Sequence, residues 1–190
     1  TWDLFKYPGI RSDSDMHTMG FRFKPWTNAK TIADGPSILE YLNQAADENN
    51  LREKIQFKTK VKTAQWDSSS ATWRLGIEKG ESGQLEDVSC KVLYLCGGYY
   101  NYDQGYLPEF KGYHDFEGTI IHPQKWPEDL NYENKKVVVI GSGATAVTIV
   151  PAMADKVSKI TMLQRSPTYY MSAPDQRAFD GFIKKITTDK

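Results

Sequence analysis

The feature that most constrains the fold of this chain is a turn of small residues between an apolar run and a helical pattern. Residues 137–140 are a continuous apolar run of the length of a buried strand. The turn covers residues 141–146, residues 147–156 show helical spacing, and residues 159–163 form a second apolar strand expected to be buried. This order of strand, turn, helix and strand predicts the start of a parallel sheet.

The turn fits the pattern G-x-G-x-x-A, a permitted form of the dinucleotide fingerprint. The first glycine permits a sharp turn, the second lets the backbone approach a pyrophosphate, and the small sixth residue lets helix and sheet pack closely. The helix that begins here would point N–H groups at the phosphates. Its context favours a cofactor-binding turn over a turn that is tight for packing alone. The residues concerned are Gly141, Ser142, Gly143, Ala144, Thr145 and Ala146.

The residues after the second strand indicate which cofactor the turn would bind. An NAD site would place Asp or Glu here, to accept a hydrogen bond from the ribose 2′-hydroxyl. This chain has Gln164, Arg165 and Ser166 instead. A guanidinium can bind a 2′-phosphate through two parallel hydrogen bonds, and a serine hydroxyl can add another. The sequence therefore favours NADPH over the alternative, an ordinary exposed arginine at a strand end.

Charge and composition argue against several classes of partner. Lys and Arg total 24 and Asp and Glu total 24, so no basic excess indicates nucleic acid or an anionic membrane. The longest apolar run, residues 137–140, is too short to cross a bilayer. Cys90 and Cys96 lie on what reads as one extended strand, which is a poor arrangement for a disulfide and too few residues for a metal site. We therefore expect reduced thiols, no metal site and a cytoplasmic protein.

Upstream of the glycine turn the sequence predicts a loop, a helix and a β-meander. Residues 1–34 form a long irregular segment, and a helix runs from residues 35–36 to about residues 49–50. Residues 99–134 return to loop, because proline and glycine interrupt them repeatedly. Between these lie consecutive strands with short polar links, which favours an antiparallel arrangement. The strands are expected over residues 55–63 (half-buried), 72–78 and 88–96.

Residues 116–127 carry a second motif, F-x-G-x-x-x-H-x-x-x-W-P. Taken alone, this segment would be a proline-rich interdomain linker with an incidental histidine. The complete pattern, directly upstream of the glycine turn, resembles the fingerprint of class B flavoprotein monooxygenases of the Baeyer–Villiger type. Its defining residues are Phe116, Gly118, His122, Trp126 and Pro127.

The resemblance extends along the whole chain and is closest to the subgroup of ethionamide-activating monooxygenases. It implies an α/β fold class, with a Rossmann-like FAD/NAD(P)-binding fold and an antiparallel β-meander, as part of a flavoprotein with two dinucleotide-binding domains. The implied parts are a partial FAD-binding domain with the meander at 1–112, a linker with the fingerprint at 113–134, and the start of an NADPH-binding domain at 135–190. The chain would then be an internal fragment.

The resemblance also implies which residues bind the cofactors. The residues that would contact FAD are Thr1, Trp2, Asp3, Leu4, Asp13 and, through its backbone, Val61. The residues that would contact NADP are Arg11, Ser12, Asp13, Gly141, Ser142, Gly143, Ala144, Thr145, Ala146, Arg165 and Ser166. His122 would act at a domain hinge. The catalytic arginine of the family is expected beyond Lys190, because Arg177 comes too early.

The implied activity uses FAD, NADPH and O₂ to convert a small ketone to an ester or lactone, with S-oxygenation of a thio-containing substrate as a further activity. Two alternatives stay open. One is an N- or S-oxygenating flavin monooxygenase, against which Trp126 and Pro127 argue, and the other is an NADPH-binding module without chemistry of its own. We expect the chain by itself to be inactive and to bind FAD weakly or not at all, because an incomplete sheet leaves its edges exposed.

Overall fold

The computed structural model describes residues 1–171, which form two compact units. One unit comprises Thr1–Ala45 together with the described residues from Asn101 onward, and the other comprises Ala46–Tyr100. Among residues 1–171, no helix has the length and apolar character that a membrane span requires.

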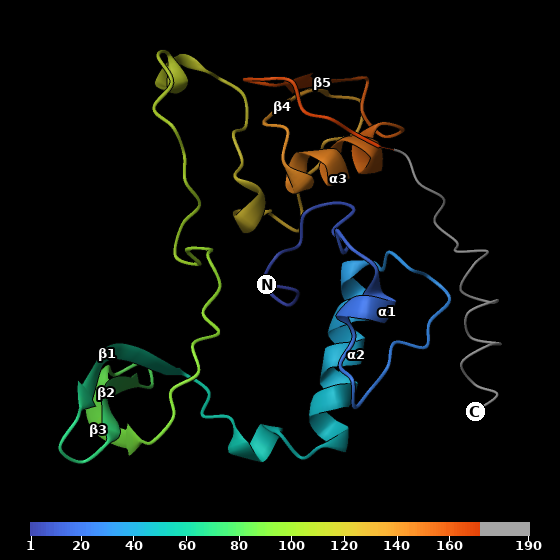
Figure 1. Cartoon of the computed structure of the whole chain (residues 1–190). Helices are drawn as coiled ribbons and strands as arrows, with labels where there is room; N and C mark the ends of the chain where they lie inside the picture. Colours follow the sequence, from blue (N-terminus) through green and yellow to red (C-terminus); the bar gives the residue numbers. More distant parts are fainter. Residues whose placement is uncertain (172–190) are drawn as a thin grey trace, which may run out of the picture. The chain divides into compact units, whose positions relative to one another are not determined.

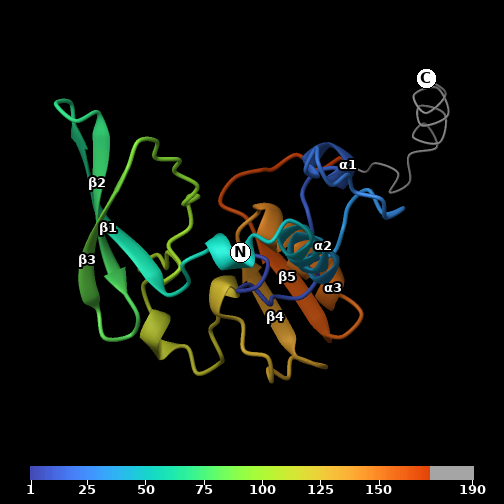
Figure 2. The same cartoon turned by 90° about the horizontal axis from the view of Figure 1, so that it is seen from below.

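The unit of Ala46–Tyr100 contains an antiparallel meander, as the sequence predicts. Its strands β1 (Thr59–Asp67), β2 (Thr72–Lys79) and β3 (Gln84–Cys90) neighbour one another in chain order (Figure 2). Gly80 and Gly83 both take a φ of +67° in the connection between β2 and β3. Positive φ at glycine lets this connection close within a few residues.

The first strand differs from its prediction in both position and burial. β1 begins at Thr59 rather than at residue 55, because Lys58 takes a φ of +50° and its carbonyl accepts a hydrogen bond from the N–H of Gly80 at 2.8 Å. The half-buried character is also wrong, because Val61 is 52% exposed and most of β1 is exposed with it. Within this unit, which is described throughout, the buried residues are Leu75 and Ile77 of the central strand.

The third strand is also shorter than predicted at its end. It was expected to continue to residue 96, but β3 ends at Cys90, which pairs with Trp73 near the start of β2. In this register only Thr72 of β2 lies beyond Trp73, so the pairing could not continue to residue 96. Cys96 therefore lies outside the strand, exposed, and both cysteines are free.

The helix α2 (Gly35–Glu48) forms where helical spacing predicts it and buries one face in the core of the other unit. The hydroxyl of Tyr41 donates to the carbonyl of Lys24 at 2.5 Å and accepts from the N–H of Phe21 at 2.7 Å. The loop before α2 contains a short helix that was not predicted, α1 (Met16–Met19) (Figure 1). The buried cluster consists of Met16, Trp26, Ala33, Ile38 and Tyr41.

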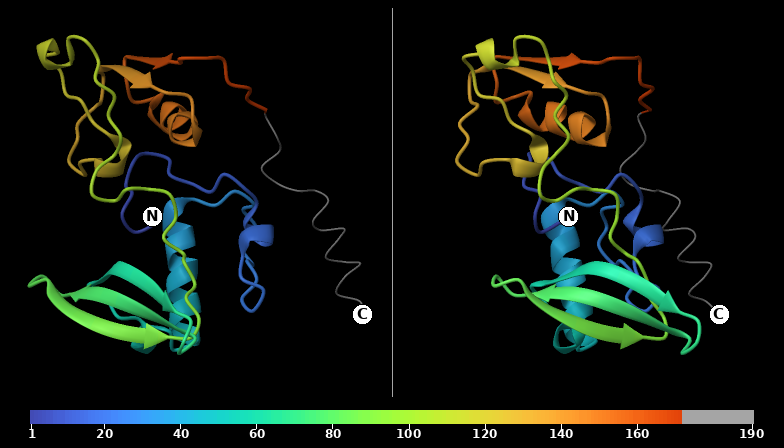
Figure 3. Two further views of the ribbon diagram at one scale, coloured as in Figure 1. Left: turned by 60° about the vertical axis from the view of Figure 1, so that its left-hand side comes forward. Right: turned by 90° about the vertical axis from the view of Figure 1, so that its left-hand side faces the viewer.

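The predicted strand, helix and strand are β4 (Lys136–Ile140), α3 (Ala144–Met153) and β5 (Lys159–Leu163), and the two strands are parallel. α3 begins and ends about a turn earlier than the predicted range of 147–156, because it starts directly after Gly143. Figure 3 shows α3 against one face of the two strands. Met153, at the end of α3, is 1% exposed.

The opposite face of β4 and β5 is exposed, which corrects the expectation that both strands are buried. Val138, Ile140 and Leu163 are 62%, 60% and 55% exposed. Apolar runs of this kind are typical of parallel strands covered on both faces. Among the described residues, only one face of this sheet carries a helix, so alternate side chains remain in solvent.

Candidate dinucleotide site and fingerprint segment

The glycine turn follows β4 directly and is fixed to the end of β5. The N–H of Gly141 donates to the carbonyl of Leu163 at 2.9 Å, and Gly141 takes a φ of +126°. A φ of this value strongly favours glycine. A Cβ added at Gly141 or Gly143 would meet no heavy atom within 4 Å. The space beside both glycines is therefore open to a ligand, which argues against a turn that is tight for packing alone.

The first turn of α3 presents its backbone donors at this open space. Gly143 is the N-cap, in an extended conformation, and no side chain caps the helix. The first N–H groups of a helix have no partner within the helix and carry the positive end of its dipole. The small Ala146 is 8% exposed, as the packing of helix against sheet requires. This cradle fits a pyrophosphate.

Arg165 and Ser166 lie at the same edge of the sheet as the glycine turn. Because Ile140 pairs with Leu163 in parallel register, residue 141 and the residues after Leu163 leave the sheet at the same end. Both Arg165 and Ser166 are exposed. A cationic fork beside a helix N-terminus fits a dinucleotide that carries an additional phosphate.

The segment after Arg165 lies against the glycine turn. The hydroxyl of Thr168 donates to Ser142 Oγ at 2.7 Å, and the hydroxyl of Tyr170 donates to the carbonyl of Ser142 at 3.4 Å. Ser142 therefore already has protein partners at one side of the cradle, and because its hydroxyl oxygen accepts from Thr168, its O–H can still donate to a bound phosphate.

The N-terminal loop packs closely on α3. A Cβ at Gly9, which has a φ of +75°, would lie 2.7 Å from Ala152 Cβ and 2.9 Å from the carbonyl oxygen of Thr148. Nearer the glycine turn, the Tyr7 hydroxyl is hydrogen-bonded to Thr145. Burial raises the pKa of Tyr7, the bond to Thr145 lowers this pKa, and the negative charge of Asp13 raises it. These contacts bring the loop that holds Arg11 to Asp13 next to the first turn of α3.

Within that loop, Ser12 differs from its neighbours. It is 4% exposed, its N–H donates to the carbonyl of Ala33 at 2.8 Å, and its hydroxyl oxygen accepts from the N–H of Ala33 at 3.1 Å. Arg11 and Asp13 are exposed, and the backbone of Arg11 forms an isolated bridge with Asp34. Ser12 thus holds the loop to the residues before α2, whereas the side chains of Arg11 and Asp13 are accessible.

The residues expected to line FAD lie in different parts of the structure. Thr1 begins a tight turn, since its carbonyl accepts from the N–H groups of Leu4 and Phe5 at 3.1 and 2.9 Å. Trp2 is partly buried against the core cluster, whereas Asp3 and Leu4 are exposed. Val61 lies on β1 of the meander unit, where the register shifts.

The fingerprint residues shape their own segment. A Cβ at Gly118 would come within 2.5 Å of the Phe116 ring, so the ring covers the space that the glycine leaves. His122 is the N-cap of η3 (Pro123–Lys125), and its Nδ1 accepts from the N–H of Gln124 at 3.3 Å. The motif therefore combines a ring folded over a glycine with a histidine-capped turn.

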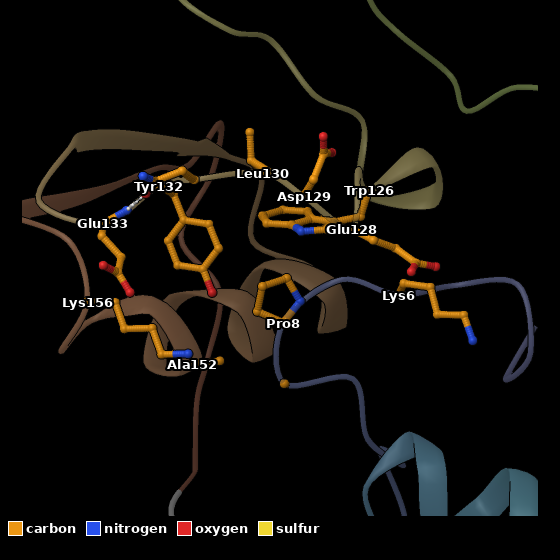
Figure 4. A pocket seen from close by; sticks show the side chains of 12 residues that line it. Lys6, Pro8, Trp126, Glu128, Asp129, Leu130, Tyr132, Glu133, Ala152 and Lys156 are labelled. Atoms are coloured by element: carbon orange, nitrogen blue, oxygen red, sulfur yellow. Dashed lines mark hydrogen bonds between the residues drawn. The ribbon is translucent and has the colours of Figure 1, made fainter.

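Trp126 forms part of a hollow of about 810 Å³ between the fingerprint segment and the N-terminal loop. Its ring meets that of Tyr132 edge-on at 6.0 Å, and Figure 4 shows Pro8 of the N-terminal loop facing these rings. The hollow reaches the last turn of α3 at Ala152, whereas the glycine turn lies at the first turn, roughly 12 Å away at about 1.5 Å per residue. It is therefore separate from the phosphate cradle. The lining residues are Lys6, Pro8, Gly9, Trp126, Glu128, Asp129, Leu130, Asn131, Tyr132, Glu133, Ala152 and Lys156.

Residues 101–105 contact the fingerprint segment, and no motif in the sequence singles them out. Gln124 Nε2 donates to the carbonyl of Asn101 and Lys125 Nζ to the carbonyl of Tyr102, both at 3.2 Å. The only sequence signal is a glycine, Gly105, among several tyrosines in a predicted loop.

In residues 1–171, no group of three or more His, Cys, Asp or Glu side chains is arranged to hold a metal ion.

The fold and these motifs are those of a flavoprotein monooxygenase, and comparison with known proteins supports the same class. The family described as flavin-binding monooxygenase-like matches residues 28–182, and the chain belongs to this family. It is 56% identical over 187 residues to the FAD-containing monooxygenase EthA of Mycobacterium tuberculosis. That alignment covers 98% of this chain and 37% of EthA, so the chain spans little more than a third of that relative.

Solved structures of related monooxygenases have the same fold. Cyclohexanone monooxygenase from Rhodococcus sp. Phi1 bound to NADP⁺ matches with a TM-score of 0.76 and 30% identity, over 100% of this chain and 35% of its own. An oxidized steroid monooxygenase bound to NADP matches with a TM-score of 0.78 and 29% identity. The match covers 99% of this chain and 36% of the steroid monooxygenase. These likenesses confirm the predicted family resemblance and the Rossmann-like fold class.

Proposed function

We propose that the intact protein containing this chain is an FAD- and NADPH-dependent monooxygenase of the Baeyer–Villiger type. The observation that carries the proposal is the open glycine cradle, with Arg165 at the same sheet edge, directly after a complete fingerprint. The overall reaction would consume a ketone, O₂, NADPH and a proton, and would yield an ester or lactone, NADP⁺ and water. The similarity to monooxygenases solved with NADP⁺ supports this assignment.

The proposed roles of the NADP-binding residues follow from the cradle. The N–H groups at the start of α3 would bind the pyrophosphate, with Gly143 giving close approach. Arg165 and Ser166 would bind the 2′-phosphate, and Arg11 and Asp13 would lie on the nicotinamide side. When bound, the cofactors supply hydride transfer and oxygen activation, and the protein orients them and excludes water.

For FAD we propose the turn at residues 1–4, Asp13 and the backbone of Val61. The support is that the loop containing Asp13 contacts the first turn of α3 through Tyr7. We further propose the domain limits given by the resemblance, at residues 112 and 134, with His122 acting at the hinge. The chain by itself is proposed to be inactive, in keeping with the exposed apolar face of β4 and β5.

The substrate would be a small ketone, and Trp126 followed by Pro127 favours this class over nitrogen or sulfur oxidation. A thio-containing substrate is a second candidate, because the sequence resembles the subgroup of ethionamide-activating monooxygenases named above. The two free cysteines support the proposed cytoplasmic location.

The test is to purify the intact protein, record its flavin absorbance, and follow NADPH oxidation with a ketone or a thioether. We expect a yellow protein that forms an ester or lactone from the ketone. The matched control is Gly143→Ala, which should retain flavin and lose NADPH oxidation. A colourless protein, or one that forms only a sulfoxide, would contradict the proposal.

A further inference from the structure

Residues 101–105 contact the N-terminal turn on one side and the fingerprint segment on the other. The Tyr102 hydroxyl is hydrogen-bonded to Thr1 Oγ1 at 2.7 Å, and the Tyr102 ring lies 5.8 Å from that of Phe5. On the other side, the carbonyl of Tyr102 accepts from Lys125 Nζ at 3.2 Å. A single residue therefore joins the turn at the start of the chain to η3.

Gly105 gives this segment a second contact with the fingerprint. A Cβ added at Gly105 would overlap the ring atoms of His122. The φ of Gly105 is not in the positive range that favours glycine, so the His122 ring, rather than the backbone, excludes a side chain here. The fingerprint histidine thus rests in the space that Gly105 leaves.

The side chains of η3 that hold residues 101–105 come from variable positions of the fingerprint. Gln124 and Lys125 occupy the x positions between His122 and Trp126, and their side chains donate to main-chain carbonyls. Every residue type has a main-chain carbonyl, so these two hydrogen bonds depend on where the backbone of residues 101–102 runs and not on its side chains. That path is in turn fixed to Thr1 through the Tyr102 hydroxyl.

We propose that residues 101–105 form a seat for the fingerprint segment, and that Tyr102 is a positioning residue that couples η3 to the N-terminal turn. The coupling to catalysis rests on the proposed function, in which the N-terminal turn lines FAD and η3 belongs to the hinge. A shift of η3 would move the Tyr102 carbonyl and, through the rigid phenol, Thr1. The seat itself is a property of the fold and can be tested without turnover.

The first experiment measures hydrogen exchange in the intact protein, in wild type and in Tyr102→Phe. The amides of interest are Leu4 and Phe5 in the N-terminal turn and Gln124 and Lys125 in η3. We expect exchange to become about fivefold faster at both places, which corresponds to the loss of one ordinary hydrogen bond. Tyr106→Phe is the matched control, since Tyr106 is 84% exposed. A change confined to the N-terminal turn, or equal to that in the control, would overturn the proposal.

A second variant, Gly105→Ala, distinguishes the loss of a specific contact from a general folding defect. Gly105→Ala should displace the His122 ring and speed exchange at Gln124, whose N–H donates to that ring. In a His122→Ala background the same substitution should have no further effect, because the two sites are in contact. An equal effect in both backgrounds would contradict the seat.

The final measurement connects the seat to the reaction. Tyr102→Phe should lower the rate of flavin reduction by NADPH about fivefold, while the Kd for NADP⁺ stays unchanged because the glycine cradle is intact. A loss of NADP⁺ affinity equal to the loss of rate would overturn the positioning role. If wild-type protein reduces no flavin, the proposed function fails, and the exchange results still decide whether the seat exists.

Discussion

The glycine turn and the fingerprint segment are held in place in different ways. The turn lies between a strand and a helix, and its φ of +126° at Gly141 and its bond to Leu163 follow from that regular framework. The fingerprint segment contains only the short η3, and contacts from the distant residues 101–105 and from Tyr132 hold it. A pattern within regular structure thus predicts geometry, whereas a pattern in a loop identifies a family without predicting its contacts.

The largest expected effect tests the packing of the N-terminal loop against α3, the helix that follows the glycine turn. Gly9→Ala places a methyl group against Ala152 and the carbonyl of Thr148 at a residue with positive φ. Strain and overpacking together should lower the free energy of unfolding by about 2–4 kcal/mol in urea denaturation. Gly80→Ala is the control, because its φ is also positive but its nearest atom lies 3.9 Å away; it should lose about 1 kcal/mol. Equal losses would show that α3 is not held by this contact.

A second pair of variants separates backbone strain from access by the cofactor. Gly141→Ala should lose both stability, by about 1–3 kcal/mol, and NADP⁺ affinity. Gly143→Ala, at a φ of −77°, should leave stability within about 0.5 kcal/mol and lose NADP⁺ affinity by on the order of tenfold to 100-fold. Thermal unfolding and calorimetric titration measure the two quantities. Unchanged affinity in Gly143→Ala would remove the glycine turn from the site.

The strand, turn, helix and strand from Lys136 to Leu163 could be predicted largely because each depends on neighbouring residues. The apolar run of β4 and the glycine turn placed the parallel strands correctly, apart from the shift of α3 toward Gly143. The meander was predicted in type but not in extent, since pairing with Lys79 determines where β1 begins and pairing with Trp73 determines where β3 ends. Burial failed where it depended on other layers, as at Val61 and Val138.

The candidate site was predictable to a smaller degree. The G-x-G-x-x-A pattern and Arg165 share a sheet edge, as parallel register requires. No local pattern indicates that Tyr7 meets Thr145 or that Gly105 receives the His122 ring. These contacts join residues far apart in the chain, and a single sequence carries no signal for such pairs.

A smaller effect is expected in the fingerprint segment. Trp126→Ala should lower stability by about 1 kcal/mol, because the edge-on contact with Tyr132 is lost. Trp126→Phe should recover part of this loss, since a phenyl edge can still face Tyr132. Urea denaturation of both variants measures the difference. A loss as large as that of Gly9→Ala would contradict the view that this segment is held by a few contacts at its surface.

The smallest expected effect concerns pH. Because the pKa of Tyr7 is raised in the folded protein, the folded state retains this proton more strongly than the unfolded state. Its contribution is fully present below the ordinary pKa of 10.0 and is lost as pH rises through the folded pKa. The stability of wild type should therefore fall more steeply above this pH than that of Tyr7→Phe. Parallel profiles in urea denaturation would show that Tyr7 is not coupled to folding.

In the proposed function, the turn after β4 and Arg165 after β5 form one NADPH site. The most direct measurement is the ratio of the Kd for NAD⁺ to the Kd for NADP⁺ in the intact protein, in wild type and in Arg165→Ala. Lys159→Ala, at the opposite end of β5, is the matched control. We expect Arg165→Ala to lower this ratio about 10-fold to 100-fold, with NAD⁺ affinity unchanged, and Lys159→Ala to leave it as in wild type. An equal loss of affinity for both dinucleotides, or no loss, would show that Arg165 does not bind the 2′-phosphate.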